Sequence, residues 1–310
     1  MISETLLRKI GFCPEDAQLL LQQAAPFFNG LSALAADYMA GNGQGSVIPY
    51  THEEFTQKRD RAQAFLLQAR TLCSTCHRYT AELLFWLFCV PHAEKYYREN
   101  GISHAVFWDS MYDLVCKTQM CRKNYGIVGV YIDWFYLIFD LQVFALGRLQ
   151  FYAERFEAER YKWGDFALQK GDPVYSCHIP ANGPLDTDAC LDSFQKAYDF
   201  FKDRLTGPVI PITCESWLVY PPYVEKVFVP NSNMTRFAAL FDIIGQSSTG
   251  DRFLDARNVF GRYLDGDIST LPCHTTLQKN FIRYIKEGNL FGSGYGIALY
   301  DGEQRQILNI

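Results

Sequence analysis

The apolar residues in the first third of the chain recur every three to four positions, which is the period of an amphipathic helix. Pro14 opens one such segment, and Thr51 with Glu54 forms a capping-box pattern before a long helix that we expect to end near Cys73. Further helices are predicted over 77–90, 91–99 and 103–122, with a loop at 41–45. Because no strand-like alternation occurs before about residue 128, this pattern predicts an all-helical first domain.

Near residue 125 the pattern changes to short apolar runs separated by amphipathic helices. Strands are predicted at 144–156, 209–213 and 296–300, around Val259, and in a hairpin over 166–178. Helices are predicted from Asp186 to about Leu205, and at 221–228, 232–241 and 274–287. Strands that alternate with helices are typical of a mixed sheet. We therefore predict an α+β protein, with a helical domain over 1–125 and a mixed α/β domain over 126–310.

The composition excludes several classes of protein. The chain has 310 residues, of which 48% are hydrophobic, and its net charge of -5 argues against nucleic acid as the main partner. The N-terminal residues lack the apolar segment of a signal peptide, and the most apolar run, 127–146, is interrupted by Asp133 and Asp140. We therefore expect a cytoplasmic protein that neither spans nor binds a membrane, with its ten cysteines as free thiols. The sequence does not indicate an oligomeric state.

One string, Cys73-Ser-Thr-Cys76-His77, matches the attachment pattern of a c-type haem. Covalent haem attachment requires export, which the N-terminus does not predict. A zinc site would need a second pair of ligands at suitable spacing, and Cys116 and Cys121 are five positions apart. We therefore expect no haem and no metal, and interpret the two thiols as residues of a helix.

Two candidates for acid–base chemistry follow predicted strands. His178 ends one strand, where a histidine can accept a proton or orient a substrate, although it can equally bond the loop backbone. Glu215 follows the strand at 209–213 and precedes Trp217. A carboxyl that is desolvated beside an indole has a raised pKa and suits proton removal from an amine. The alternative is an exposed acid beside a core tryptophan.

Other polar or reactive residues near these strands each have a functional and a structural interpretation. Cys214 is a possible nucleophile, although nothing in the sequence activates it. Ser232 and Asn233 begin a helix, where capping is the ordinary role and substrate binding the alternative. Tyr220 and Tyr223 either line a pocket or start a helix.

A glycine run precedes the last predicted strand. Gly292, Gly294 and Gly296 let backbone N–H groups approach a phosphate, and Arg257 and Arg262 lie earlier in the sequence as sources of positive charge. The order of helix, glycines and strand differs from the strand, glycines and helix of dinucleotide and P-loop motifs. A turn or bulge is therefore the alternative interpretation of this run.

The second half of the chain contains an ordered set of strings that resembles a known family. The strings are 146–151, 178–185, 214–218, 230–233 and 292–296. Together they resemble a bacterial family that has a helical N-terminal domain and a C-terminal domain similar to GNAT-type N-acetyltransferases. The sequence departs from this family at Glu215, where the family often has histidine, and it lacks the usual phosphate-binding signature of acetyltransferases, to which 257–261 is only a distant approximation.

The resemblance implies a GNAT-like fold and an acyl-coenzyme A-dependent N-acyltransferase, with acetyl-CoA or another acyl-CoA as co-substrate and an unidentified small-molecule or peptide amine as acceptor. The site residues expected for that reaction fall into three groups. The first is Glu215 or His178 as base with Tyr220 or Tyr223 as acid, and the second is Trp217, Ser232 and Asn233 at the substrate. The third is the pyrophosphate site, formed by Gly292, Gly294 and Gly296 or by Arg257 and Arg262. Two alternatives remain open, a non-catalytic binding module of the same fold and a thiol hydrolase that uses Cys214 with His178.

Overall fold

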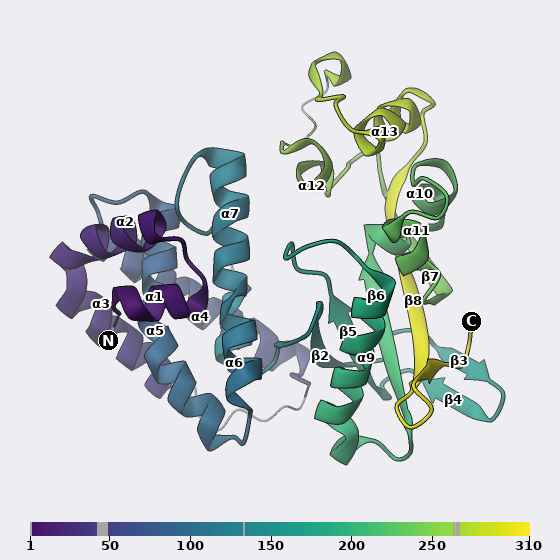
Figure 1. The fold of residues 1–310 in the computed structure, drawn as a ribbon, viewed down its shortest axis with the longest axis horizontal. Helices are drawn as coiled ribbons and strands as arrows, with labels where there is room; N and C mark the ends of the chain where they lie inside the picture. The colour runs from purple at the N-terminus through teal and green to yellow at the C-terminus, as the bar shows by residue number, and fades with distance from the viewer. Residues whose placement is uncertain (1, 42–48, 133, 263, 265–266) are drawn as a thin grey trace. The chain divides into compact units, whose positions relative to one another are not determined.

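A computed structural model describes residues 2–41, 49–132, 134–262, 264 and 267–310 of the chain (Figure 1). The chain forms two compact units, one of residues 1–146 with 180–182 and one of residues 147–179 with 183–310. Residues 126–146, which we expected in the second domain, therefore belong to the first unit. Apart from Gly41, the loop predicted at 41–45 lies outside the described residues.

The first unit is built from helices joined by short connections. They are α1 (Glu4–Ile10), α2 (Pro14–Ala24), η1 (Ala25–Phe27), α3 (Phe28–Ala40), α4 (His52–Leu72), α5 (Arg78–Glu99), α6 (His104–Met111), α7 (Asp113–Tyr125) and α8 (Phe135–Phe139), followed by the short strand β1 (Phe144–Leu146). The predicted capping box is confirmed, because Thr51 Oγ1 accepts from the Glu54 N–H at 3.2 Å and the Glu54 carboxylate accepts from the Thr51 N–H at 2.8 Å.

Helix α5 runs through the core of this unit and continues past an internal proline. The sequence predicted separate helices over 77–90 and 91–99, but α5 continues through Pro91. Every residue from Thr80 to Val90 is buried, so tertiary packing outweighs the backbone hydrogen bond that a proline removes. At its centre Trp86 stacks on Phe139, with 5.1 Å between ring centroids. The single helix predicted over 103–122 is instead divided into α6 and α7.

The second unit is a sheet with helices. Its elements are β2 (Leu149–Arg155), β3 (Arg160–Trp163), β4 (Phe166–Gln169), β5 (Pro173–His178), α9 (Thr187–Phe201), η2 (Lys202–Arg204), β6 (Val209–Ser216), η3 (Trp217–Val219), α10 (Pro221–Lys226), α11 (Asn233–Ala238), β7 (Asp242–Gly250), α12 (Ala256–Phe260), η4 (Ile268–Thr270), α13 (Thr276–Lys286), β8 (Phe291–Asp301) and β9 (Gln306–Ile307). Within this unit the strand order is β2-β5-β6-β8-β7, with β9 beside β8. Strands β5 and β6 are parallel, and the other pairs are antiparallel. The predicted α+β fold is thus confirmed.

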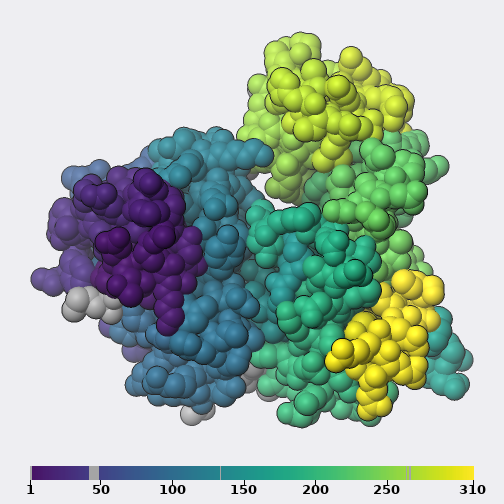
Figure 2. All heavy atoms as spheres, viewed as in Figure 1, coloured from purple at the N-terminus to yellow at the C-terminus, as the bar shows by residue number. Residues whose placement is uncertain are grey.

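The two faces of this sheet are covered differently. Helix α9 packs on one face (Figure 1), where Phe194 meets Phe151 with 6.3 Å between ring centroids and Phe201 meets Tyr175 with 4.3 Å. On the other face, the hairpin of β3 and β4 covers part of the sheet. We call the part under the hairpin the apolar half of this face. Its hydrophobic core consists of Phe156, Tyr161, Leu168, Val174, Ile297 and Leu299. The C-terminal segment lies beside the hairpin (Figure 2), where Asn309 Nδ2 donates to the Tyr161 hydroxyl at 2.8 Å.

Several predicted strands differ from the structure. The turn at Lys170–Asp172 exists, but the two strands that it joins do not pair with each other, because β4 pairs with β3 and β5 with β2. Val259 lies in α12 rather than in a strand, and β7 was not predicted. Strand β8 begins at Phe291, so the glycine run is part of a strand that has a ladder on each side.

Candidate functional site

A polar patch occupies the sheet face that α9 leaves free, next to the half that the hairpin covers. Cross-strand partners share a face, so the pairs Gln150 with His178, Tyr152 with Ser176, Ser176 with Thr213, and Glu215 with Tyr295 fix its members. We call this set the polar sheet face. Its residues are Gln150, Tyr152 and Glu154 from β2, Ser176 and His178 from β5, Thr213 and Glu215 from β6, and Ser293 and Tyr295 from β8.

This face coincides with the place where the parallel strands stop pairing. Strands β5 and β6 share only two registers, Tyr175 with Ile212 and Ser176 with Thr213. Beyond those, β5 runs on to His178 while β6 runs on to Ser216. The carboxyl ends of neighbouring parallel strands are a usual place for a ligand site, since backbone and side-chain polar groups converge there.

Glu154 belongs to this face and is suited to proton transfer, although the sequence analysis did not single it out. Its side chain extends across β5, so that its Oε1 accepts from the Thr213 hydroxyl of β6 at 2.9 Å. Burial raises the pKa of the Glu154 carboxyl to about 7, although the hydroxyls of Thr213 and Ser176 favour its ionised form and lower the pKa, while Glu157 and Glu215 raise it. At neutral pH both protonation states of this carboxyl are therefore populated, which suits a general base.

Two tyrosines lie near the Glu154 carboxyl. Burial, and then the charge of Glu154, raises the pKa of both Tyr152 and Tyr295. Both phenols consequently remain protonated at neutral pH and can donate a hydrogen bond or a proton. The Tyr295 ring lies 6.2 Å from that of Phe156, at the border between the polar sheet face and the apolar half.

Glu215 and His178, the two predicted bases, both belong to the polar sheet face. Glu215 is exposed, and its Oε1 accepts from Ser293 Oγ at 3.4 Å. The desolvation that we expected at Glu215 is found instead at Glu154. His178 is the half-buried last residue of β5.

Tyr220, the predicted acid, lies on the opposite side of β8. The positions of Gly292 and Gly294 alternate along that strand with those of Ser293 and Tyr295, so they face the other way. Tyr220 is buried there, and a Cβ added to Gly292 would lie 2.8 Å from its ring. The sheet thus separates Tyr220 from Glu215 and His178. Trp217 lies in an aromatic cluster with Tyr223, Phe228 and Phe281.

The glycine run has a structural explanation that does not involve a phosphate. Gly294 and Gly296 pair with both β6 and β7, and Gly292 pairs with β7, which engages their backbone in sheet ladders. A Cβ added to Gly294 would lie 2.1 Å from the Val219 carbonyl oxygen, and one on Gly296 would lie 2.8 Å from Phe241. These glycines therefore allow η3 and the segment after α11 to pack directly on the strand. The run thus lies within β8 and not before the last strand, where we expected it.

The remaining predicted contacts with substrate and pyrophosphate have local partners in the structure. Ser232 caps α11 by accepting from the Thr235 N–H at 3.3 Å, and Asn233 Oδ1 accepts from Arg236 Nη2 at 3.0 Å. Arg257 lies in α12, and the Arg262 guanidinium donates to the Thr270 hydroxyl. Both arginines are half-buried.

The cysteines of the sheet face away from the polar residues. Cys214 and Cys177 are buried neighbours on the side that α9 covers, because their positions alternate with those of the polar sheet face. Cys214 and His178 therefore lie on opposite faces of the sheet, which is contrary to the arrangement that a thiol hydrolase would need. In the haem-like string, burial raises the pKa of the Cys73 thiol to about 12, and His77 Nδ1 accepts from the Tyr79 N–H at 3.2 Å.

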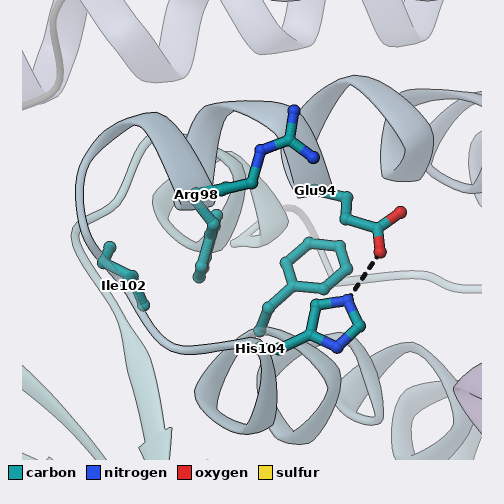
Figure 3. Close-up of a pocket in the computed structure, with 6 residues that line it drawn as sticks. Glu94, Arg98, Ile102 and His104 are labelled. Atoms are coloured by element: carbon teal, nitrogen blue, oxygen red, sulfur yellow. Dashed lines mark hydrogen bonds and ion pairs between the residues drawn. The ribbon is translucent and has the colours of Figure 1, made fainter.

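A hollow of about 290 Å³ lies in the first unit, between α5 and the start of α6 (Figure 3). Its lining residues are Glu94, Tyr97, Arg98, Ile102, His104 and Phe107. Glu94 Oε1 and His104 Nε2 are 2.8 Å apart at its rim, where both side chains are partly exposed. Among the residues that the structure describes, no three His, Cys, Asp or Glu side chains are grouped to hold a metal ion, and no helix is long and apolar enough to cross a membrane.

Two protein-family models match the sequence. Residues 1–141 match the N-acyltransferase N-terminal domain, and residues 143–298 match the GNAT-like C-terminal domain. The fold and the polar sheet face thus define a two-domain protein with a helical N-terminal part and a GNAT-like C-terminal part. The chain belongs to the family of the GNAT-like C-terminal domain, as the resemblance predicted.

Several solved structures of similar fold are described as acyltransferases. One, in complex with decanoyl-CoA and teicoplanin, aligns with a TM-score of 0.67 at 19% identity, over 95% of this chain and 86% of the other. Another, in complex with CoA and 10C-teicoplanin, aligns with a TM-score of 0.67 at 19% identity, over 94% and 86% of the two chains. No protein with a curated description matches the chain. At this identity the likeness establishes the fold.

Proposed function

We propose that the protein is an N-acyltransferase that moves an acyl group from an acyl-CoA to an amine. The observation that carries this proposal is the family match over 143–298, the region that contains the polar sheet face and the ends of β5 and β6 beyond their shared registers. The structures of similar fold support the same donor class, because their descriptions are of acyltransferases with acyl-CoA or CoA. The acceptor is a small molecule or peptide that bears an amine.

The proposed reaction is a direct transfer in a ternary complex. The amine nitrogen attacks the thioester carbonyl carbon, the new C–N bond forms, and the C–S bond breaks with its electron pair on sulfur. The protein must hold the two reactants together, remove a proton from the ammonium and stabilise the oxyanion. Beyond their last shared register, β5 and β6 present backbone groups to the same edge, and we propose that this edge holds the extended arm of the donor.

The residues predicted from the sequence differ in the roles that we propose for them. We propose that His178 and the exposed Glu215 contact the acceptor, since both lie at the open end of the polar sheet face. Arg257 and Arg262 remain our proposed partners for the pyrophosphate, since they lie in the same unit and each carries a positive charge. Trp217, Ser232 and Asn233 have packing and capping roles, and we propose no further role for them.

Calorimetric titration with CoA, acetyl-CoA and decanoyl-CoA tests the donor, and release of free thiol with a panel of amines tests the transfer. We expect saturable binding of at least one acyl-CoA, and thiol release only when an amine is present. A folded protein that binds none of these compounds would refute the proposal. Binding without release, across primary alkyl amines and peptides with a free amino group, would favour the alternative of a non-catalytic binding module.

A further inference from the structure

The position of Glu154 singles out one point on the polar sheet face. Its side chain starts on β2 and crosses β5, and Oε1 is held by the Thr213 hydroxyl at 2.9 Å. Thr213 opposes Ser176 in the last register that the parallel strands share. The Glu154 carboxyl therefore lies where β5 and β6 stop pairing, which is where the proposed function needs the two reactants to meet.

We propose that Glu154 is the general base of this site and that the acceptor binds to the polar sheet face as a cation. This inference rests on the proposed function, because it assigns the proton acceptor and the substrate class of the same reaction. Before the attack, the ammonium passes one proton to the Glu154 carboxylate, which returns it to solvent after the transfer. The second proton that leaves nitrogen ends on the sulfur of the departing thiol. The products are an amide, free CoA and one proton.

The charges around Glu154 select for a cation. Glu215 faces it from β6 and Glu157 from the segment after β2, and both disfavour its ionised form. The uncharged titratable neighbours on the same face are Tyr152 of β2 and Tyr295 of β8, and the Cys177 thiol of β5 lies behind them on the opposite face of the sheet. Carboxylates in a partly desolvated site attract an ammonium group and repel an anionic acceptor.

A second feature of the same face also indicates a ligand. Gln150 is only 1% exposed, and its Oε1 has no hydrogen-bond partner among the described residues. It shares β2 and the polar sheet face with Glu154, and its register partner is His178. A buried acceptor of this kind is normally satisfied, so an N–H or O–H group of a bound molecule is the expected partner.

Thr213 positions the Glu154 carboxylate through its hydroxyl. Removing that hydroxyl should shift the pH profile of the reaction, which a merely structural role of Thr213 would not do. Its hydroxyl stabilises the ionised carboxylate, so Thr213→Val should raise the pKa of Glu154 and move the rising limb of the kcat/KM profile to higher pH. Glu215→Gln removes a like charge and should move the same limb to lower pH. Glu303→Gln changes an exposed carboxylate near the C-terminus and serves as the control, with no shift expected.

The decisive experiment measures kcat/KM between pH 5 and pH 9 for the wild type, Glu154→Gln, Glu154→Asp, Thr213→Val, Glu215→Gln and Glu303→Gln. Acyl-CoA affinity from calorimetry shows for each variant whether the site is intact. We expect Glu154→Gln to lower kcat/KM by about 100-fold or more while acyl-CoA affinity is unchanged, and Glu154→Asp to retain part of the activity. If the wild type is inactive, the proposed function fails first. If the wild type is active but Glu154→Gln stays within about threefold of it, Glu154 is not the base.

The substrate class is tested with two amines that differ in their remote group. The amine 1,4-diaminobutane carries a second ammonium, whereas 4-aminobutanoate carries a carboxylate at the same distance. We expect the wild type to prefer the diamine by about tenfold or more in kcat/KM, and Glu215→Gln to reduce that preference. Equal use of both amines, or a preference for 4-aminobutanoate, would overturn the assignment of a cationic acceptor even if Glu154 is the base.

Discussion

Replacing Glu154 by glutamine should stabilise the folded protein at alkaline pH while it removes activity. The folded-state pKa of about 7 lies above the ordinary value of 4.5, so the native state binds more protons than the unfolded chain between these values. The free energy of unfolding must then fall as pH rises through this window. Glutamine keeps an oxygen that can accept from Thr213 but carries no charge at any pH.

The linkage relation gives the size of the effect. With these two pKa values, the ionisable carboxyl costs the native state about 1 kcal/mol at pH 5 and about 3 kcal/mol at pH 8. Relative to the wild type, Glu154→Gln should therefore gain about 2 kcal/mol in the free energy of unfolding between pH 5 and pH 8. Partial exposure of the side chain makes this an upper figure.

Urea denaturation of the wild type, Glu154→Gln and Glu303→Gln at both pH values measures this difference. Glu303→Gln replaces an exposed carboxylate and is the control for this comparison. A stability difference between Glu154→Gln and the wild type that is the same at pH 5 and pH 8 would refute the reasoning, since it would mean that the carboxyl is not desolvated in the folded state.

Two further predictions test the sheet. Gly294→Ala places a Cβ 2.1 Å from a backbone oxygen of η3 and should destabilise the second unit by about 3 kcal/mol or more in a thermal melt. The control, Gly207→Ala, adds a Cβ that meets nothing within 4 Å and should be nearly neutral. Equal melting temperatures of the two variants would contradict the packing of η3 on β8. A thiol reagent should modify the exposed Cys13 and Cys273 of the native protein rapidly and the buried Cys214 only on unfolding, and early labelling of Cys214 in peptide mapping would revive the thiol hydrolase.

The helical half was the part of the fold that the sequence predicted best, because its signals are local. The capping box at Thr51 fixes the start of α4 through contacts within four residues. The error at Pro91 arose from the same reliance on local signals, since the burial that carries α5 past that proline comes from the surrounding helices. Strand β7 gave no clear pattern, because much of Asp242–Gly250 is polar or glycine and its pairing with β8 is remote in sequence.

The polar sheet face was predictable only in part. His178 and Glu215 became candidates because His178 ends a predicted strand and Glu215 follows one, and these positions are visible in the sequence. The sequence also shows Gln150, Tyr152 and Glu154 alternating with apolar neighbours. This alternation does not tell which side of the strand is shielded from water in the folded protein. That depends on the order of strands, which places Thr213 within reach of Glu154 across β5. The glycine run was misjudged for the same reason, because its two ladders come from distant segments.

A purely structural role explains Glu154 less well than a catalytic one. The buried carboxylates of the first unit have basic partners, since Glu82 pairs with Arg70 at 2.8 Å and Asp140 with Lys58 at 2.9 Å. Among the described residues Glu154 has hydroxyl partners and nearby carboxylates but no ion pair. A neutral glutamine could accept from Thr213 without the cost of a desolvated charge. A carboxyl that weakens the fold at neutral pH, and whose pKa lies near that pH, is what a site for proton transfer requires.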